Sequence, residues 1–434
     1  MSAGVPIIDL DVLPPRSRTE PRSLRLRLAA ARPVLVAGVI VLALAVLGAA
    51  VPPSHRMTRV LSAGGTASAA FVLGPDSLYT AQFGNDPNSS SSVRAFSLLD
   101  GSLRWAVGVP QNVQNLVLDP RAHVLMGRSG VDPRMIFLDA DSGDELWHSA
   151  DANTSVVGMA NGGVLIRTDL SQTETRLRLA DARTGRQVWS RTVDPTAELG
   201  PDDLYGDSPS RIVVVATTGE LTVLNYADGA VLSQGNLRVN LPADNDPYFP
   251  GDFVAVSTVG DHVYVSRRAD GRATLTAYTT VPFGRQWQVV GGPVGQVHEC
   301  ATVLCVADTR FVSAVDPATG ATRWSEPNWS TAFGYDATHL FAYDQQEKPG
   351  SALLDASTGK LVRRLGQTIF VGGLLLRSDD RFRARVWVAQ TDPSDGRTHI
   401  VGSLDSEAPY GCEARGGYLA CPTAAGPTGV WRMP

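Results

Sequence analysis

A hairpin pattern that recurs about every 40 residues constrains the fold of this chain most. In each full copy an apolar stretch leads into a turn with Asp and Gly, and Trp stands four residues after the Gly. The full copies lie at 93–105, 135–147, 177–189 and 312–324, and weaker copies lie at 221–233, 275–287, 351–363 and 386–400. Short apolar strands repeated at this period are typical of one four-stranded β-propeller blade.

The two ends of the chain predict how such a ring closes. Residues 410–415 and the C-terminal segment 416–434 supply the first three strands of a blade but no outer strand. Met57–Leu61 precedes the first full blade and suits the missing strand. Both ends of the chain would then share one blade, which leaves no exposed sheet edge. We therefore expect an all-β propeller of eight or nine four-stranded blades.

The turn residues of the repeat have separate physical roles. Asp accepts hydrogen bonds from nearby backbone N–H groups, and Gly takes the positive φ that a tight hairpin requires. The Trp at one fixed place, as in Gly143 followed by Trp147, offers a large flat surface. We expect it to pack between neighbouring blades, where each indole would bury about 150–250 Å².

The spacing of Asp139, Gly143 and Trp147 resembles the pyrroloquinoline-quinone-like propeller repeat, and the resemblance extends over residues 57–434. That family includes quinoprotein alcohol dehydrogenases and the non-enzymatic propeller of the outer-membrane β-barrel assembly machinery. The enzymes share an adjacent cysteine pair, calcium held by carboxylate and amide ligands, and a catalytic Asp. This chain has no Cys-Cys pair, and none of its residues can be carried over onto the calcium or catalytic positions. We therefore expect no catalytic site, metal or cofactor.

One segment near the N-terminus predicts a membrane anchor. Residues 33–51 are 19 consecutive residues without a charge, and a helix of that length would cover about 28 Å of the ~30 Å hydrocarbon core. Arginines before it outnumber those just after it, which orients the N-terminus toward the cytoplasm. The arginines before it are Arg16, Arg18, Arg22, Arg25, Arg27 and Arg32, and those after it are Arg56 and Arg59.

This orientation predicts three parts: a cytoplasmic basic tail over 1–32, a transmembrane helix in contact with lipid over 33–51, and an extracytoplasmic propeller over 57–434. The alternative is a cleaved signal peptide, for which Gly48, Ala49 and Ala50 are small enough. The apolar run exceeds the usual 7–15 residues of signal peptides, so an uncleaved single-pass anchor in the cell membrane is favoured.

The four cysteines occur as two local pairs, each flanking the expected hairpin between the first and second strands of a blade. In an oxidising compartment the economical pairing is Cys300 with Cys305 and Cys412 with Cys421, because the other two connectivities would join distant blades. Metal binding or redox exchange is the alternative, but the chain has no Cys-x-x-Cys spacing.

Composition narrows the function classes. The chain of 434 residues has 38 basic and 43 acidic side chains and a net charge of -5, so it lacks the basic footprint of a nucleic-acid-binding protein. Neither a Gly-x-Ser-x-Gly elbow nor a Walker-type phosphate loop occurs.

The longest step in the repeat, from Gly229 to Gly284, contains an inserted segment with acidic and aromatic residues. A loop inserted on a rigid blade can carry function, although a tolerated surface insertion is the alternative. The residues of this candidate partner loop are Asp244, Asp246, Tyr248, Phe249 and Asp252.

These observations favour a membrane-tethered extracytoplasmic scaffold or sensor with an unknown protein partner at the cell envelope. The alternatives are a quinone- or sugar-related ligand-binding or oxidoreductase propeller, and a binder of cell-wall carbohydrate.

Overall fold

The computed structural model describes sixteen segments of the chain, all of them C-terminal to residue 56. They are 57–63, 69–82, 90–110, 112–129, 134–149, 153–171, 173–194, 196–201, 209–241, 253–308, 311–344, 350–378, 385–391, 397–406, 410–423 and 426–434. The predicted tail (1–32), the predicted transmembrane helix (33–51) and the candidate partner loop lie outside these segments. Within them, no helix has the length and apolar character that crossing a membrane requires.

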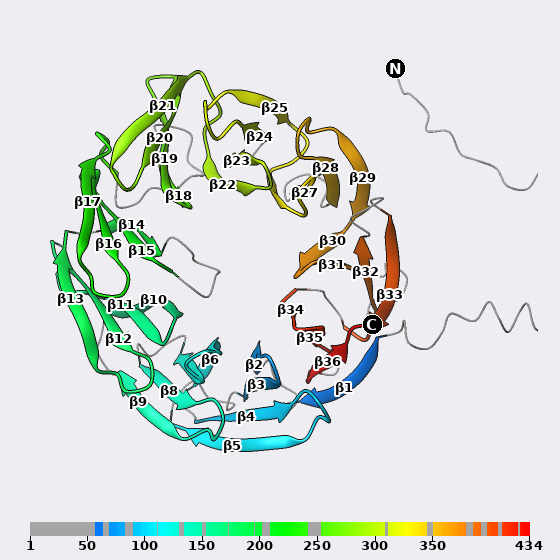
Figure 1. Cartoon of the computed structure of the whole chain (residues 1–434). Helices are drawn as coiled ribbons and strands as arrows, with labels where there is room; N and C mark the ends of the chain where they lie inside the picture. The colour runs from blue at the N-terminus through cyan, green and yellow to red at the C-terminus, as the bar shows by residue number, and fades with distance from the viewer. Residues whose placement is uncertain are drawn as a thin grey trace, which may run out of the picture. The chain divides into compact units, whose positions relative to one another are not determined.

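The strands form nine four-stranded antiparallel sheets, which stand around a ring as the blades of a propeller (Figure 1). Blades 1–3 follow one another directly along the chain. Blade 1 holds β2 (Ala69–Leu73), β3 (Ser77–Gln82), β4 (Ser91–Ser97) and β5 (Leu103–Val109); blade 2 holds β6 (Val113–Asp119), β7 (Val124–Ser129), β8 (Met135–Asp139) and β9 (Glu145–Ser149); blade 3 holds β10 (Thr154–Ala160), β11 (Gly163–Asp169), β12 (Thr175–Asp181) and β13 (Gln187–Val193).

Blades 4–6 continue the same order. Blade 4 holds β14 (Thr196–Pro201), β15 (Arg211–Ala216), β16 (Glu220–Asn225) and β17 (Val231–Asn236); blade 5 holds β18 (Phe253–Val259), β19 (His262–Ala269), β20 (Arg272–Thr279) and β21 (Gly284–Val290); blade 6 holds β22 (Gln296–Cys300), β23 (Val303–Ala307), β24 (Val312–Val315) and β25 (Thr322–Glu326).

Blades 7 and 8 are also continuous in sequence, whereas blade 9 joins the two ends of the propeller. Blade 7 holds β26 (Thr331–Gly334), β27 (His339–Asp344), β28 (Gly350–Asp355) and β29 (Leu361–Gly366); blade 8 holds β30 (Thr368–Val371), β31 (Leu374–Ser378), β32 (Val386–Thr391) and β33 (Thr398–Leu404); blade 9 holds β34 (Glu413–Arg415), β35 (Tyr418–Pro422), β36 (Thr428–Arg432) and β1 (Thr58–Ala63).

Strand position within a blade explains the sequence patterns. Middle strands are covered on both faces by the neighbouring blades, so they read as apolar runs, as in Arg211–Ala216, where every side chain after the first is buried. Outermost strands alternate between exposed and covered side chains, as in Leu103–Val109. The first strand of each blade lies toward the centre of the ring, and the last lies at the rim (Figure 1).

The hydrophobic core is divided among the nine junctions between blades. Each junction has its own cluster of buried side chains contributed by two neighbouring blades; Tyr79 of blade 1 and Leu125 of blade 2, for example, share one cluster. The junction between blades 9 and 1 is built in the same way, with Leu61 and Val430 packed near Leu73. Burial between sheets therefore extends around the whole ring.

The predicted closure is confirmed. Strand β1 pairs antiparallel with β36, with Thr58 opposite Arg432 and Leu61 opposite Val430. Figure 1 shows the two strands side by side, blue against red. Of the eight or nine blades expected from sequence, the structure has nine. The ambiguity came from the weaker sequence copies at 221–233, 275–287, 351–363 and 386–400, which depart from the full repeat.

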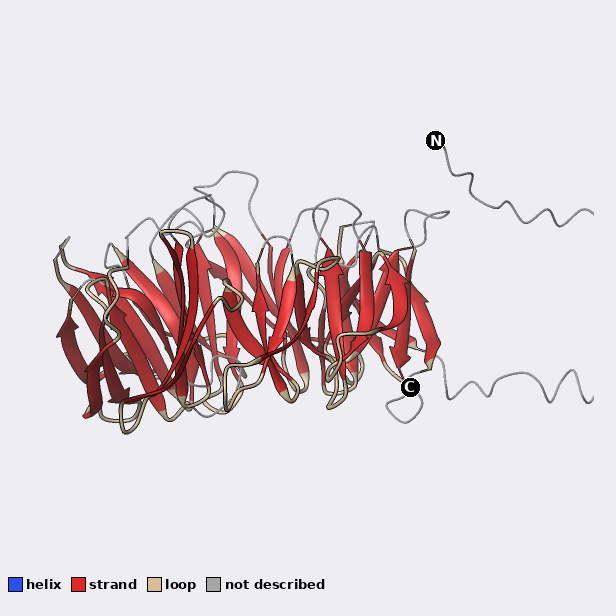
Figure 2. Ribbon diagram, turned by 90° about the horizontal axis from the view of Figure 1, so that it is seen from above, coloured by secondary structure: helices blue, strands red, loops and turns tan. Residues whose placement is uncertain are grey.

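Figure 2 shows the strands running between two loop-bearing faces of the ring. Because each blade is antiparallel, the turn between its second and third strands shares one face with the crossing to the next blade. We call this the crossing face; the Asp-Gly hairpins lie on the opposite face.

Candidate functional site

The Trp of each full repeat docks onto the hairpin of the next blade, as predicted. The indole Nε1 of Trp147 in blade 2 donates a hydrogen bond of 2.8 Å to the carbonyl of Ala182 in blade 3. A Cβ added at Gly185, whose φ is +66°, would lie 2.7 Å from that indole. The glycine is required because it combines a left-handed backbone with close contact to the ring.

This contact recurs at five junctions. The indole donors and carbonyl acceptors are Trp105 to Ala140 (3.0 Å), Trp147 to Ala182 (2.8 Å), Trp189 to Tyr226 (2.9 Å), Trp287 to Pro317 (2.9 Å) and Trp324 to Ala356 (3.0 Å).

The hairpin Asp holds the turn that the Trp contacts. A carboxylate oxygen of Asp355 accepts the backbone N–H groups of Ser357 and Thr358 at 3.1 and 2.8 Å. The hydroxyls of the same two residues hold the pKa of Asp355 below its usual value. The Asp of the repeat therefore serves turn geometry.

At the junction between blades 4 and 5, the aromatic ring comes from the hairpin of the following blade instead of the outer strand of the preceding blade. Ser233 stands four residues after Gly229, where other blades have Trp, and Phe283 stands four residues before Trp287, where other blades have the docking Gly. The Phe283 N–H donates to the Ser233 hydroxyl at 3.1 Å, and its ring lies against Gly235. The aromatic side chain thus comes from blade 5 instead of blade 4, which the weaker sequence copies did not reveal.

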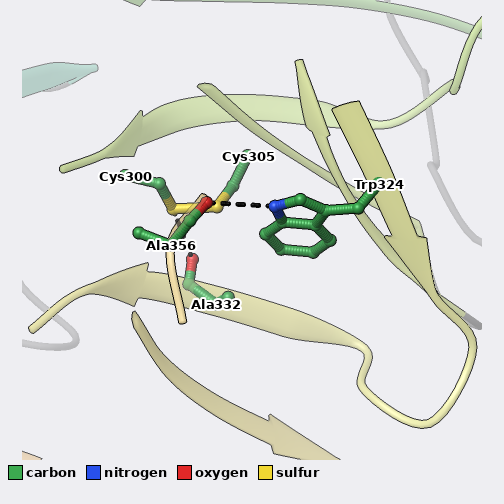
Figure 3. The surroundings of a disulfide bond; sticks show 5 residues. All are labelled: Cys300, Cys305, Trp324, Ala332 and Ala356. Atoms are coloured by element: carbon green, nitrogen blue, oxygen red, sulfur yellow. Dashed lines mark hydrogen bonds between the residues drawn. A yellow bond between two sulfur atoms is a disulfide. The ribbon is translucent and has the colours of Figure 1, made fainter. Parts of the chain in front are cut away.

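The predicted disulfide between Cys300 and Cys305 is confirmed, and it ties β22 to β23 within blade 6. Both cysteines are fully buried in the cluster that includes Trp324, the docking indole of the junction with blade 7. Figure 3 shows the disulfide beside this indole and its hydrogen bond to Ala356. The disulfide therefore stiffens one wall of a blade junction.

The predicted disulfide between Cys412 and Cys421 is also confirmed, and it lies in the closing blade. It ties the start of the short strand β34 to β35. Beside it, a carboxylate oxygen of Glu413 accepts the backbone N–H of Leu73 in blade 1 at 2.7 Å. Desolvation by burial raises the pKa of Glu413. The inner strand of blade 9 is thus held from both sides.

The candidate partner loop connects the outermost strand of blade 4 to the innermost strand of blade 5. Described residues on either side of it, Leu241 and Phe253, are buried. The loop's acidic and aromatic residues (244, 246, 248, 249 and 252) lie outside the described segments. Their role as a partner-binding site stays a prediction.

Two grooves between blades were not predicted from the sequence. One, of about 520 Å³, lies between blades 4 and 5 and is lined by Arg238, Arg267 and Arg268 together with Asn236 and other residues. The other, of about 580 Å³, lies between blades 7 and 8. Both adjoin junctions whose outer strand has no docking Trp: position 233 is Ser, and position 363, four residues after Gly359, is Arg. At position 363 the missing Trp was the available sequence signal, whereas at the junction of blades 4 and 5 Phe283 supplies the aromatic ring.

Among the side chains that the structure describes, no group of three or more His, Cys, Asp or Glu could hold a metal ion.

Comparison with known proteins gives one family match. The family model described as outer membrane protein assembly factor BamB matches residues 89–326, which is more than half of the chain. No curated protein sequence matches this chain.

Several solved structures are similar to this chain at low sequence identity. BamB from Moraxella catarrhalis is 14% identical, with 87% of this chain and 98% of that chain covered and a TM-score of 0.46. A europium-containing methanol dehydrogenase is 13% identical, with 86% of each chain covered and a TM-score of 0.42. The computationally designed Ika8 protein is 12% identical, with coverage of 86% and 99% and a TM-score of 0.44.

Proposed function

The chain belongs to the pyrroloquinoline-quinone-like propeller family described as outer membrane protein assembly factor BamB, and on that premise we propose that it is a non-catalytic protein-interaction scaffold. The observation that carries the proposal is the closed ring of nine blades. A ring without a free end keeps its loops at fixed distances from one another, which lowers the entropy cost of binding a partner.

The cell envelope is the proposed location, with residues 33–51 as the anchor in the cytoplasmic membrane and the propeller outside. Two observations support it. The segment 33–51 has the length and orientation signals of a single span. Both cysteine pairs are disulfide-bonded, which suits an oxidising compartment.

Cysteine labelling in intact cells tests this topology. Arg176→Cys places a thiol on an exposed position of β12, and Ser17→Cys places one in the predicted cytoplasmic tail. A membrane-impermeant maleimide should label the first variant in intact cells and the second only after lysis. Labelling in the opposite order would reject the proposed orientation.

Site-specific crosslinking tests the scaffold proposal. A photoreactive amino acid in place of Tyr248 should give one discrete crosslinked protein from the envelope. The same amino acid in place of Arg176, at an exposed position of blade 3, serves as the control. The absence of any saturable crosslinked partner at several loop positions would contradict a scaffold role.

A further inference from the structure

Among the described residues, the core cluster at the junction between blades 7 and 8 is the smallest of the nine. It contains four buried residues, Phe341, Leu353, Leu365 and Leu375, whereas the cluster between blades 6 and 7 contains thirteen. Arg363 takes the place where other outer strands carry the docking Trp.

A groove of about 580 Å³ occupies this junction, a volume within the range of ligand-binding sites. Its lining combines three arginines with apolar and hydroxyl side chains and, within the described segments, includes neither Asp nor Glu. The lining residues are Arg363, Arg364, Leu365, Thr368, Leu375, Arg377, Ser378, Trp387, Ala389, Thr398 and Ile400.

The guanidinium groups come from two strands that face each other across the groove. Arg363 and Arg364 belong to β29 of blade 7, and Arg377 belongs to β31 of blade 8; all three side chains are exposed. The guanidinium of Arg364 lies over the ring of Trp329 at 5.9 Å. Among the described residues, no carboxylate pairs with Arg363 or Arg377.

Arginines that line one groove repel one another, in a chain that has more acidic than basic side chains overall. An anionic ligand between them would remove that repulsion and form bidentate hydrogen bonds. The groove between blades 4 and 5 differs because one of its arginines, Arg268, is already paired with Asp308 at 3.2 Å. The groove between blades 7 and 8 is therefore the better anion site.

The apolar part of the lining indicates what kind of anion. Trp387 and Ile400 contribute apolar surface beside the arginines, and Ile400 is 64% exposed. A free phosphate would leave this surface in water. A peptide with both carboxylate and apolar side chains would cover it and neutralise the charge.

We propose that the groove between blades 7 and 8 binds an acidic peptide segment of a partner protein. Carboxylates of the segment pair with Arg363 and Arg377, and an apolar side chain packs against Trp387 and Ile400. This inference rests on the proposed scaffold function and names the chemistry of the partner.

Fluorescence anisotropy with the purified full-length chain in detergent tests it. The probe is a fluorescein-labelled peptide of sequence Glu-Leu-Glu-Phe-Glu-Leu-Glu, and the matched neutral peptide has Gln in place of every Glu. The acidic peptide should bind saturably at physiological ionic strength, and the neutral peptide should not. Inorganic phosphate at equal concentration should leave the bound fraction unchanged.

The double variant Arg363→Gln, Arg377→Gln should weaken acidic peptide binding by about tenfold or more, because it removes two charge-assisted contacts. Arg364 stays in place since it packs on Trp329. Arg176→Gln, at an exposed position of blade 3, removes one positive charge away from the groove and should leave binding unchanged. Thermal unfolding of each variant verifies that the ring is intact.

Three results would overturn the inference: no saturable binding of the acidic peptide, equal binding to the double variant, or full competition by inorganic phosphate, which would indicate a small-anion site. Crosslinking from position 248 separates this inference from the scaffold proposal. A partner crosslinked equally to the native chain and the double variant would leave the scaffold standing and reject the groove. Peptide binding without any crosslinked partner would reject the scaffold.

Discussion

At the scale of single residues, the repeat combines three side-chain properties at one contact. Asp shapes the hairpin through its carboxylate, Gly supplies a left-handed backbone without a side chain, and Trp from the preceding blade covers that Gly. The Trp147 indole and Gly185 show why the three occur together: the φ of +66° at Gly185 presents a bare backbone, and the indole lies against it. Each residue type would contribute less to the contact between blades without the other two.

Gly185→Ala should destabilise the propeller more than Gly271→Ala. Both glycines have a positive φ, of +66° and +72°, but an added Cβ meets the Trp147 indole at 2.7 Å in the first case and nothing within 4 Å in the second. The backbone strain costs about 1–2 kcal/mol at each site, and overpacking adds about 1–3 kcal/mol at Gly185 only. Urea unfolding measures both; equal losses would contradict the docking role.

A partly buried imidazole predicts a pH dependence at the same scale. Desolvation by burial lowers the pKa of His298 from the ordinary 6.5, and its Nε2 has no hydrogen-bond partner among the described atoms. Below about pH 6.5 the unfolded chain therefore binds more protons than the folded one, and stability falls as the pH drops toward the folded pKa.

His298→Gln should reduce the loss of stability between pH 7.5 and pH 5.5, measured by urea unfolding. His148→Gln is the control because the His148 side chain is 64% exposed, and it should leave the burial-dependent loss of stability in place. An unchanged pH profile in His298→Gln would show that other groups carry the acid sensitivity.

At the scale of strands and blades, adjacent sheets are matched in pairs. Where blade 4 has Ser233 in place of Trp, blade 5 supplies Phe283 in place of Gly, and the N–H of Phe283 donates to the Ser233 hydroxyl. One aromatic ring fills the junction in either arrangement. The unit of packing is thus the junction, and neither blade alone determines it.

A double-mutant cycle at this junction tests the pairing. Phe283→Gly and Ser233→Trp should each destabilise the propeller by about 1–3 kcal/mol, the first by leaving a gap and the second by crowding. The double variant recreates the arrangement of the other junctions, so part of the loss should be recovered. If chemical denaturation shows that the two losses of unfolding free energy are additive, the pairing of Ser233 with Phe283 is contradicted.

At the scale of the whole molecule, stability depends on closing a ring from sequentially ordered sheets. Each blade buries its faces only against neighbours, so blade 9 must be complete for blades 8 and 1 to be covered. Pairing of β1 with β36 completes it, and the disulfide between Cys412 and Cys421 secures its inner strand. The same logic explains why the junction between blades 7 and 8 can hold a groove without opening the ring.

Removing β1 should open the ring. A chain beginning at residue 64 loses the partner of β36 and the buried Leu61, whereas a chain beginning at residue 57 keeps both. The shorter chain should melt several degrees lower and self-associate through the unpaired edge of β36. Calorimetry and sedimentation compare the two; equal melting temperatures and monomeric behaviour would show that closure contributes little.

Local sequence determined the strands, the hairpins, the disulfide pairs and the closing role of residues 57–61, because turn chemistry, apolar runs and short loops act between residues close in the chain or repeated at a fixed period. Tertiary structure decided the rest. The blade count stayed at eight or nine because the weaker copies depart from the repeat, and the structure shows that each of them forms a complete blade. At the junction of blades 4 and 5, the aromatic side chain comes from Phe283 and the position of the Trp is taken by Ser233. Between blades 7 and 8, arginines line a groove. Both features depend on side chains of different blades meeting in space, and the sequence of a single repeat does not encode which side chains meet.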